Sequence, residues 1–141
     1  MRSTGKSIVE WRKLREGGIG DAVELHPLLL LPPRDWLHER CDLRFEQMLE
    51  RGAVDEVRAL LALNLPADAP VMRAIGVPEI AAMLRGEIDR EEALARGQAA
   101  TRQYAKRQYT WFRNQPPERW PRYTEVYNDS EFNIIERLFQ F

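Results

Sequence analysis

Apolar residues return at intervals of three and four along much of the chain, which is the spacing of one buried helix face. Over residues 35–51 the apolar positions are Leu37, Cys41, Phe45, Met48 and Leu49. A helix is predicted there, with Gly52 in the position that commonly follows a helix end. A second helix is predicted over residues 54–63, where the inward-facing side chains are Val57, Leu60 and Leu61.

Two further helices are predicted in the second half of the chain. Pro78 suits the first position of a helix, so residues 78–84 are predicted to be helical. Asp89, followed by acidic residues in the next turn, is typical of a helix start, and a long helix is predicted from there to about Arg113. Gly97 lies inside this helix at a cost of about 1 kcal/mol relative to alanine. Close packing or a kink is therefore expected at Gly97.

One short segment favours a strand instead of a helix. Residues 25–31 form an apolar run that ends at Pro32 and Pro33, and runs of this length between breakers fit a buried strand. No second convincing strand is found, so this strand is predicted to lack a partner. Together with one or two helical turns over residues 8–15, the predicted fold class is mainly α with one orphan strand near residues 25–31.

Composition limits the functions that the chain can have. A chain of 141 residues suits one domain, and with a net charge of −1 any nucleic-acid surface must come from local clustering of Lys and Arg. The single cysteine, Cys41, cannot form an internal disulfide, and no Cys/His cluster has metal-ligand spacing. No apolar run is long enough to span a membrane, and no signal-peptide pattern is found. We therefore expect a cytoplasmic protein with no membrane partner.

The sequence Thr4-Gly5-Lys6-Ser7 matches the end of a phosphate-binding loop. A working loop needs a preceding strand and an earlier glycine, and only three residues precede this motif. A helix start with a small polar cap is the favoured interpretation. Because no nucleophile–base pair is found either, no catalytic residue and no metal ligand is predicted from these residues.

The predicted long helix has four cations and no acid in its second half. Arg102, Lys106 and Arg113 share one helical face with Tyr109, and Arg107 lies on the flank of that face. A stripe of cations can neutralise successive phosphates, and aromatic side chains can stack on unpaired bases. The alternative is a solvated basic face over an aromatic core stripe. The pattern alone weighs these two interpretations about evenly.

Two other segments carry candidate chemistry. One face of the helix predicted over residues 35–51 carries Arg40, Arg44, Gln47 and Arg51, and arginine suits bidentate contact with phosphate. The alternative is ion pairing with the acids of the same helix, which are Glu39, Asp42, Glu46 and Glu50. The residues alone favour these ion pairs. The segment 72–79 is typical of an ordinary turn that leads into a helix.

A series of motifs is nevertheless specific. A helix of the type RxxLxxRxxxRxxxMLxxGxxxEVxxL is matched by Arg34, Leu37, Arg40, Arg44, Met48, Leu49, Gly52, Glu56, Val57 and Leu60. Three more motifs follow, which read RAIGVPE at 73–79, MLRGE at 83–87 and ATRQYAKRQYTWFR at 100–113. Their order and spacing resemble those of the tRNA dimethylallyltransferases, also called tRNA isopentenyltransferases. The resemblance covers roughly residues 4–120.

This resemblance implies an enzyme that moves a dimethylallyl group from its diphosphate to the exocyclic N6 amine of the adenosine 3′ of the anticodon. It implies Mg²⁺ as a helper for the diphosphate and a fold like that of the phosphate-loop nucleotide kinases. The phosphate loop and the general-base aspartate of that family are not found in this chain. We therefore expect a C-terminal fragment, inactive alone, with residues 1–24 ending a helical insertion, 25–120 forming the helical part of the transferase domain, and 121–141 a tail.

The resemblance also implies binding residues. Arg40 and Arg44 match arginines that reach the donor diphosphate, and a segment that lies against tRNA is matched by Arg73, Ala74, Ile75, Gly76, Val77, Pro78 and Glu79. Cations expected on the same tRNA surface are Arg102, Lys106, Arg107 and Arg113. The family's usual Tyr-Arg is Val77-Pro78 here, so the contact of that arginine is lost. Expected partners are tRNA, dimethylallyl diphosphate and the N-terminal half of the enzyme. The alternative function is a stand-alone RNA-binding or protein-interaction module without catalysis.

Overall fold

The computed structural model describes residues 5, 7–13 and 19–126, and this part of the chain is mainly helical. Its α-helices are α1 (Ile8–Lys13), α2 (Arg34–Glu50), α3 (Ala53–Ala62), α4 (Val77–Leu84) and α5 (Arg90–Asn114). Two short 3₁₀ helices, η1 (Gly20–Ala22) and η2 (Pro70–Arg73), and two short strands, β1 (Leu29–Leu30) and β2 (Arg122–Tyr123), complete it. The helices α2 to α5 agree with their predicted bounds to about one residue, and the mainly α fold class is confirmed.

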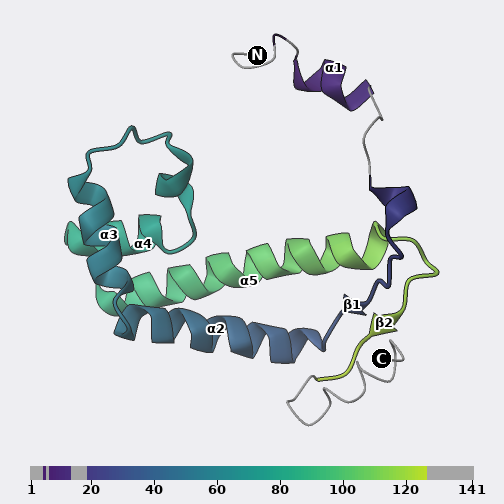
Figure 1. The fold of residues 1–141 in the computed structure, drawn as a ribbon. Coiled ribbons are helices and arrows are strands. Elements are labelled where there is room, and N and C mark those ends of the chain that lie inside the picture. Colours follow the sequence, from purple (N-terminus) through teal and green to yellow (C-terminus); the bar gives the residue numbers. More distant parts are fainter. Residues whose placement is uncertain (1–4, 6, 14–18, 127–141) are drawn as a thin grey trace.

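Helices α2 and α5 form the frame of the molecule. They lie side by side and run in opposite directions, while α3 and α4 cover the end where α2 finishes and α5 begins (Figure 1). The N-terminus of α5 is capped as the sequence predicts, because the Asp89 carboxylate accepts a hydrogen bond of 2.8 Å from the backbone N–H of Glu92. The N-terminus of α5 is therefore fixed at this covered end.

The hydrophobic core lies at the same end of the helix pair. Its buried side chains are Phe45, Leu49, Val57, Ile80 and Ala81, and they come from α2, α3 and α4. Ile80 is the most completely buried of these side chains, with 1% of its surface exposed. The apolar face predicted for residues 35–51 therefore faces this core through Phe45 and Leu49, whereas Met48 on the same face is 38% exposed.

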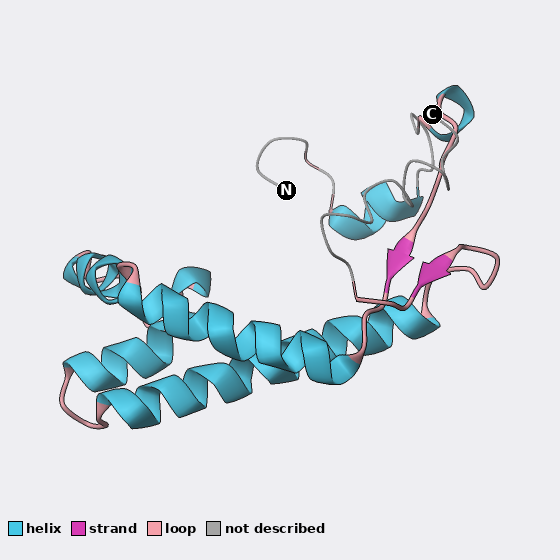
Figure 2. Cartoon of the chain, turned by 90° about the horizontal axis from the view of Figure 1, so that it is seen from below, coloured by secondary structure: helices cyan, strands magenta, loops and turns pink. Residues whose placement is uncertain are grey.

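The strand prediction is correct in position but wrong about the partner. Strand β1 pairs in parallel with β2, in a register that places Leu29 opposite Arg122 and Leu30 opposite Tyr123. Backbone N–H groups of Leu29 and Leu31 donate to Pro121 and Tyr123 carbonyls at 2.9 and 2.8 Å. The two strands lie at the end of the helix pair away from α3 and α4 (Figure 2). Strand β2 has two residues and follows a proline, so it is too short to show the alternation of apolar and polar residues that predicts a strand.

The start of α1 agrees with the polar-cap interpretation of the segment 4–7. The Ser7 hydroxyl accepts a hydrogen bond from the backbone N–H of Glu10 at 3.2 Å, and the Glu10 carboxylate accepts one from the backbone N–H of Ser7 at 2.7 Å. This reciprocal pair is a capping box. The predicted continuation of this helix to residue 15, and most of the expected tail 121–141, lie outside the described residues.

Candidate nucleic-acid and anion interface

A groove of about 470 Å³ lies between α2 and α5, and residues from three separate segments line it. We call it the α2–α5 groove. Its lining residues are Leu37, Arg40, Cys41, Arg44, Phe45, Met48, Ile75, Thr101, Tyr104, Ala105 and Gln108. The groove therefore brings together Arg40 and Arg44 of α2, one residue of the segment 73–79, and one side of the basic helix.

The guanidinium groups of Arg40 and Arg44 are not neutralised by the acids of their own helix. Neither arginine forms an ion pair with any residue that the structure describes, so the predicted alternative of intrahelical pairing is wrong for these two side chains. Arg40 lies 5.1 Å from the ring centroid of Trp36, a cation–π contact. Two exposed cations one helical turn apart thus stand over an apolar floor, which favours the binding of an anion.

Helix α5 packs through small residues rather than through its aromatic ones. Its buried positions are Ala93, Gly97 and Ala105. Three of its four aromatic side chains are largely exposed, Tyr104 by 48%, Trp111 by 57% and Phe112 by 42%, whereas Tyr109 is half-buried beside Arg34 of α2. The alternative of an aromatic core stripe beneath a solvated basic face is therefore wrong for these three residues. Exposed aromatic side chains among cations are the arrangement that can stack on unpaired bases.

The cations of α5 do not form one stripe. Arg102 donates to the Asp42 carboxylate of α2 at 2.5 Å, and both side chains are about one-third exposed. Gln98 adds a hydrogen bond of 3.3 Å from its amide to the Asp42 carbonyl. Lys106 lies beside Arg34 and Tyr109 in a small cavity of about 170 Å³. Arg102 therefore joins the two helices, and its guanidinium is already partnered.

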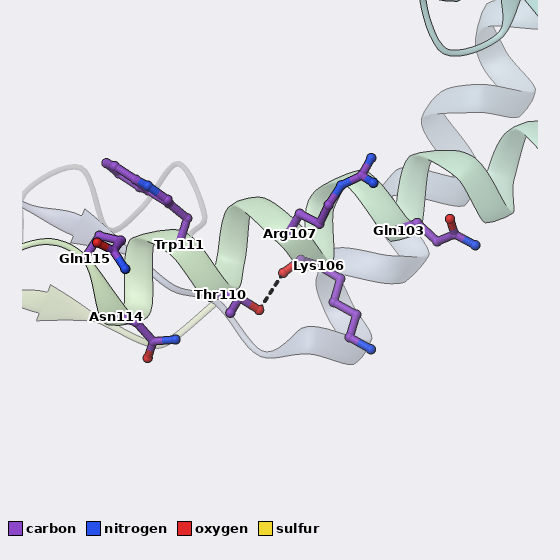
Figure 3. Close-up of a pocket in the computed structure, with 7 residues that line it drawn as sticks. All are labelled: Gln103, Lys106, Arg107, Thr110, Trp111, Asn114 and Gln115. Carbon is purple, nitrogen blue, oxygen red and sulfur yellow. Dashed lines mark hydrogen bonds between the residues drawn. The ribbon is translucent and has the colours of Figure 1, made fainter.

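The side of α5 that faces away from α2 carries Arg107, and Lys106 lies at the edge of this side, where it also borders the cavity beside Arg34. We call this side the outer face of α5, and its residues are Gln103, Lys106, Arg107, Thr110, Trp111, Asn114 and Gln115 (Figure 3). The Arg107 guanidinium lies 5.7 Å from the ring centroid of Tyr104, and the rings of Trp111 and Phe112 meet edge to face at 5.1 Å. No acidic residue occurs between positions 97 and 115 of the sequence. Arg113 lies further along, in a separate depression beside Arg122.

The segment 73–79 turns sharply into α4, and only part of it faces the groove. Gly76 has a φ of +98°, a value that favours glycine, and its N–H donates to the Glu79 carboxylate at 3.0 Å. Arg73 donates to the backbone carbonyl of Asp68 at 2.9 Å, and Val77 packs against the core. Of the seven residues predicted to bind tRNA in this segment, Ile75 is the one that lines the groove. Ala74 and Pro78 are exposed beside it.

No binding role was predicted from the sequence for several residues that line the groove. Tyr104 and Gln108 lie one turn apart on α5, and Cys41 and Met48 belong to the apolar face of α2. The spacing of Tyr104 and Gln108 is a usable signal, but only the position of α2 reveals which side of α5 they share. Burial raises the pKa of the Cys41 thiol, and the neighbouring Asp42 carboxylate raises it further. Cys41 is therefore a protonated, weakly reactive thiol at neutral pH.

These motifs match one sequence family along most of the chain. The family described as IPP transferase matches residues 1–115. The chain belongs to the IPP transferase family. Similar members include the tRNA dimethylallyltransferases of Sphingopyxis alaskensis, 64% identical over 98% of this chain, and of Erythrobacter litoralis, 57% identical over all of it. The chain spans 44% of the length of each of these two relatives.

Solved structures of the IPP transferase family share this fold. The full-length tRNA isopentenylpyrophosphate transferase of Bacillus halodurans is 31% identical, with a TM-score of 0.71, over 94% of this chain and 42% of its own. That of Staphylococcus epidermidis is 28% identical, with a TM-score of 0.70, over 82% of this chain and 36% of its own. The suspected family is therefore confirmed, and the likeness extends to the three-dimensional arrangement of the described helices.

Two further observations concern ions and membranes. The described residues of this IPP transferase chain contain no group of three or more His, Cys, Asp or Glu side chains that could hold a metal ion. No described helix is both long and apolar enough to cross a bilayer.

Proposed function

We propose that this chain forms one wall of the reaction site in an enzyme that transfers a dimethylallyl group from dimethylallyl diphosphate to the N6 amine of an adenosine in tRNA. The observation that carries this proposal is the α2–α5 groove, which unites Arg40, Arg44, Ile75 and Tyr104. Relatives that the chain matches at up to 64% identity are named tRNA dimethylallyltransferases, which supports the reaction class. We do not propose a binding module without catalysis, because no specific observation favours that function.

In this proposal Arg40 and Arg44 stabilise the negative charge of the departing diphosphate. Negative charge builds on the leaving group as its bond to the allyl carbon breaks, and preorganised cations lower the energy of that transition state. Neither guanidinium is paired with a described carboxylate, so neither must break an ion pair to bind the anion. The base that accepts the amine proton would lie in the part of the enzyme that this chain does not supply.

The outer face of α5 would hold the RNA while the adenine is presented to the reaction. The amine can reach the allyl carbon only when the adenine leaves its stack. Lys106 and Arg107 would contact phosphates, and the exposed ring of Trp111 would stack on an unpaired base. Arg113 and the exposed part of the segment 73–79 would extend this contact. Arg102 contributes mainly by holding α5 against α2.

The proposed partners are tRNA, dimethylallyl diphosphate and the remaining part of the enzyme. In that assembly we assign residues 1–24 to the end of a helical insertion, 25–120 to the helical part of the transferase domain, and 121–141 to a tail. Mg²⁺ as a helper of the diphosphate is part of the proposal for the whole enzyme. No step assigned to this chain passes through the ion.

An RNA titration tests the tRNA arm of the proposal. The chain is expected to bind a labelled anticodon stem-loop, and Lys106→Glu combined with Arg107→Glu is expected to weaken binding by tenfold or more, roughly 1.4 kcal/mol. Arg90→Glu is the matched control, because it reverses a charge at the exposed N-terminal turn of the same helix, outside the outer face. Equal affinity of the double variant and the wild type would overturn the RNA assignment.

An activity assay tests the transferase arm. The chain alone, given dimethylallyl diphosphate and tRNA, is expected to show no turnover, and clear turnover would refute the division of labour proposed here. In a fusion that supplies the remaining half, Arg44→Ala is expected to lower kcat/KM for the diphosphate by roughly ten- to a hundredfold, mainly through kcat, which is the value of one charged hydrogen bond. Arg51→Ala is the control, since Arg51 follows α2 and does not line the groove.

A further inference from the structure

Phe45 lies where the α2–α5 groove meets the hydrophobic core, next to α5 and to the turn that precedes α4. Its side chain is 2% exposed, belongs to the core cluster and also lines the α2–α5 groove. Arg44 precedes it in α2, and Cys41 lies one turn before it on the same helix. The position of this one ring is therefore linked to the placement of the groove's side chains.

The ring of Phe45 touches two glycines on different elements. A Cβ atom at Gly97 of α5 would lie 2.0 Å from Cζ of the ring, so α5 meets the ring with its bare backbone. A Cβ atom at Gly76 would lie 3.2 Å from Cε2 of the same ring. Gly76 also needs its positive φ to turn the chain into α4. One aromatic ring thus spaces α2 from α5 and supports the turn that follows Ile75.

From this arrangement we infer that Phe45 is a positioning residue, which holds the Ile75–Gly76 turn against α2 and so fixes the wall of the groove opposite Tyr104. The inference rests on the proposed function insofar as the groove serves the reaction on RNA. A smaller side chain at position 45 would leave α2 and α5 paired through contacts such as Asp42–Arg102. The turn would lose the ring on which it rests, because the Phe45 ring is what lies within 4 Å of a Cβ at Gly76.

The single cysteine provides a reporter for this inference. Cys41 and Ile75 line the same groove, and the thiol is half-buried there. In Phe45→Leu the turn is expected to move away and the rate of Cys41 alkylation by iodoacetamide to rise several-fold at fixed pH. RNA affinity is expected to fall by roughly tenfold. Val57→Ala is the matched control, because it removes buried volume from the same core without touching the groove.

A second variant separates positioning from simple packing. Gly97→Ala added to Phe45→Leu places a methyl group in space that the ring has left, so the melting temperature is expected to return toward that of the wild type. Cys41 alkylation is expected to stay fast, because the added methyl does not support the Gly76 turn. Recovery of the wild-type alkylation rate in the double variant would overturn the inference, as would equal effects of Val57→Ala and Phe45→Leu on that rate. Failure of the wild-type chain to bind RNA would instead refute the proposed function, since the alkylation measurement needs no RNA.

Discussion

At the scale of single residues, helix α5 packs closely against α2 because Gly97 has no side chain. Glycine inside a helix is unfavourable by about 1 kcal/mol relative to alanine, and the sequence therefore predicts close packing or a kink at Gly97. The structure shows close packing, because the Phe45 ring occupies the space that a Cβ atom would need. The nearest ring atom would lie 2.0 Å from that Cβ, far inside van der Waals contact.

Gly97→Ala is therefore expected to destabilise the chain despite the better helix propensity of alanine. Overpacking in a filled core costs about 1–3 kcal/mol, which exceeds the propensity gain or cancels it at the lower end. Urea unfolding followed by circular dichroism measures the difference. Gly20→Ala serves as the control, because a Cβ atom at Gly20 meets nothing within 4 Å, and its effect should stay within about 0.5 kcal/mol. A Gly97→Ala chain more stable than the wild type would contradict this packing.

Cys41 gives a second prediction at this scale. The thiolate is the reactive form, and burial together with the Asp42 carboxylate raises the pKa of the Cys41 thiol. At neutral pH alkylation of the folded chain should therefore be slower than that of a free cysteine. The rate should rise with pH toward a midpoint higher than that of the unfolded chain in urea. Asp42→Asn is expected to lower the midpoint, and a midpoint unchanged by this variant and by unfolding would show that the thiol is solvent-exposed.

At the scale of elements, local periodicity predicted the helices but not the contacts between them. The bounds of α2 to α5 follow from apolar spacing and from caps such as Asp89, which are properties of short segments. Strand β2 has two residues and pairs with a segment far away in sequence, so no local pattern could indicate it. The same limit applies to the site. Asp42 was expected to pair within α2, but it pairs with Arg102 of α5, and this pairing depends on how the helices cross.

The Asp42–Arg102 pair is expected to couple the two long helices measurably. In a double-mutant cycle with Asp42→Ala and Arg102→Ala, the coupling energy should be about 1 kcal/mol, at the upper end for partly exposed pairs. The more exposed Asp55–Arg58 pair within α3 is the control, and its coupling should be close to zero. RNA affinity should fall less for Arg102→Ala than for Arg107→Ala. The reverse order would mean that Arg102 leaves Asp42 to bind RNA.

At the scale of the whole molecule, the net charge is close to zero, but positive charge is concentrated in one segment. The net charge is −1, yet the stretch from residue 97 to 115 carries four cations and no acid. One of them, Arg102, is paired across the helices, which leaves Lys106, Arg107 and Arg113 without a described ion-pair partner. The contribution of α5 to polyanion binding should therefore depend on these three cations, and the molecule as a whole should not attract nucleic acid strongly at high salt.

Because only a few cations are available to contact phosphates, RNA affinity is expected to fall modestly as the salt concentration rises. Each phosphate neutralised contributes a slope of about −0.7 on a single strand and −0.9 on a duplex in a plot of log K against log salt concentration. The three unpaired cations between residues 97 and 115 predict a total slope of roughly −2 to −3. Arg107→Ala should reduce the magnitude by roughly one phosphate contact, whereas Arg96→Ala, whose arginine is paired with Glu92, should leave it unchanged. Anisotropy titrations of an anticodon stem-loop at several KCl concentrations measure both slopes. A slope near zero for the wild type would mean that the exposed aromatic rings bind the RNA without its phosphates, and the phosphate role of the outer face of α5 would then be wrong.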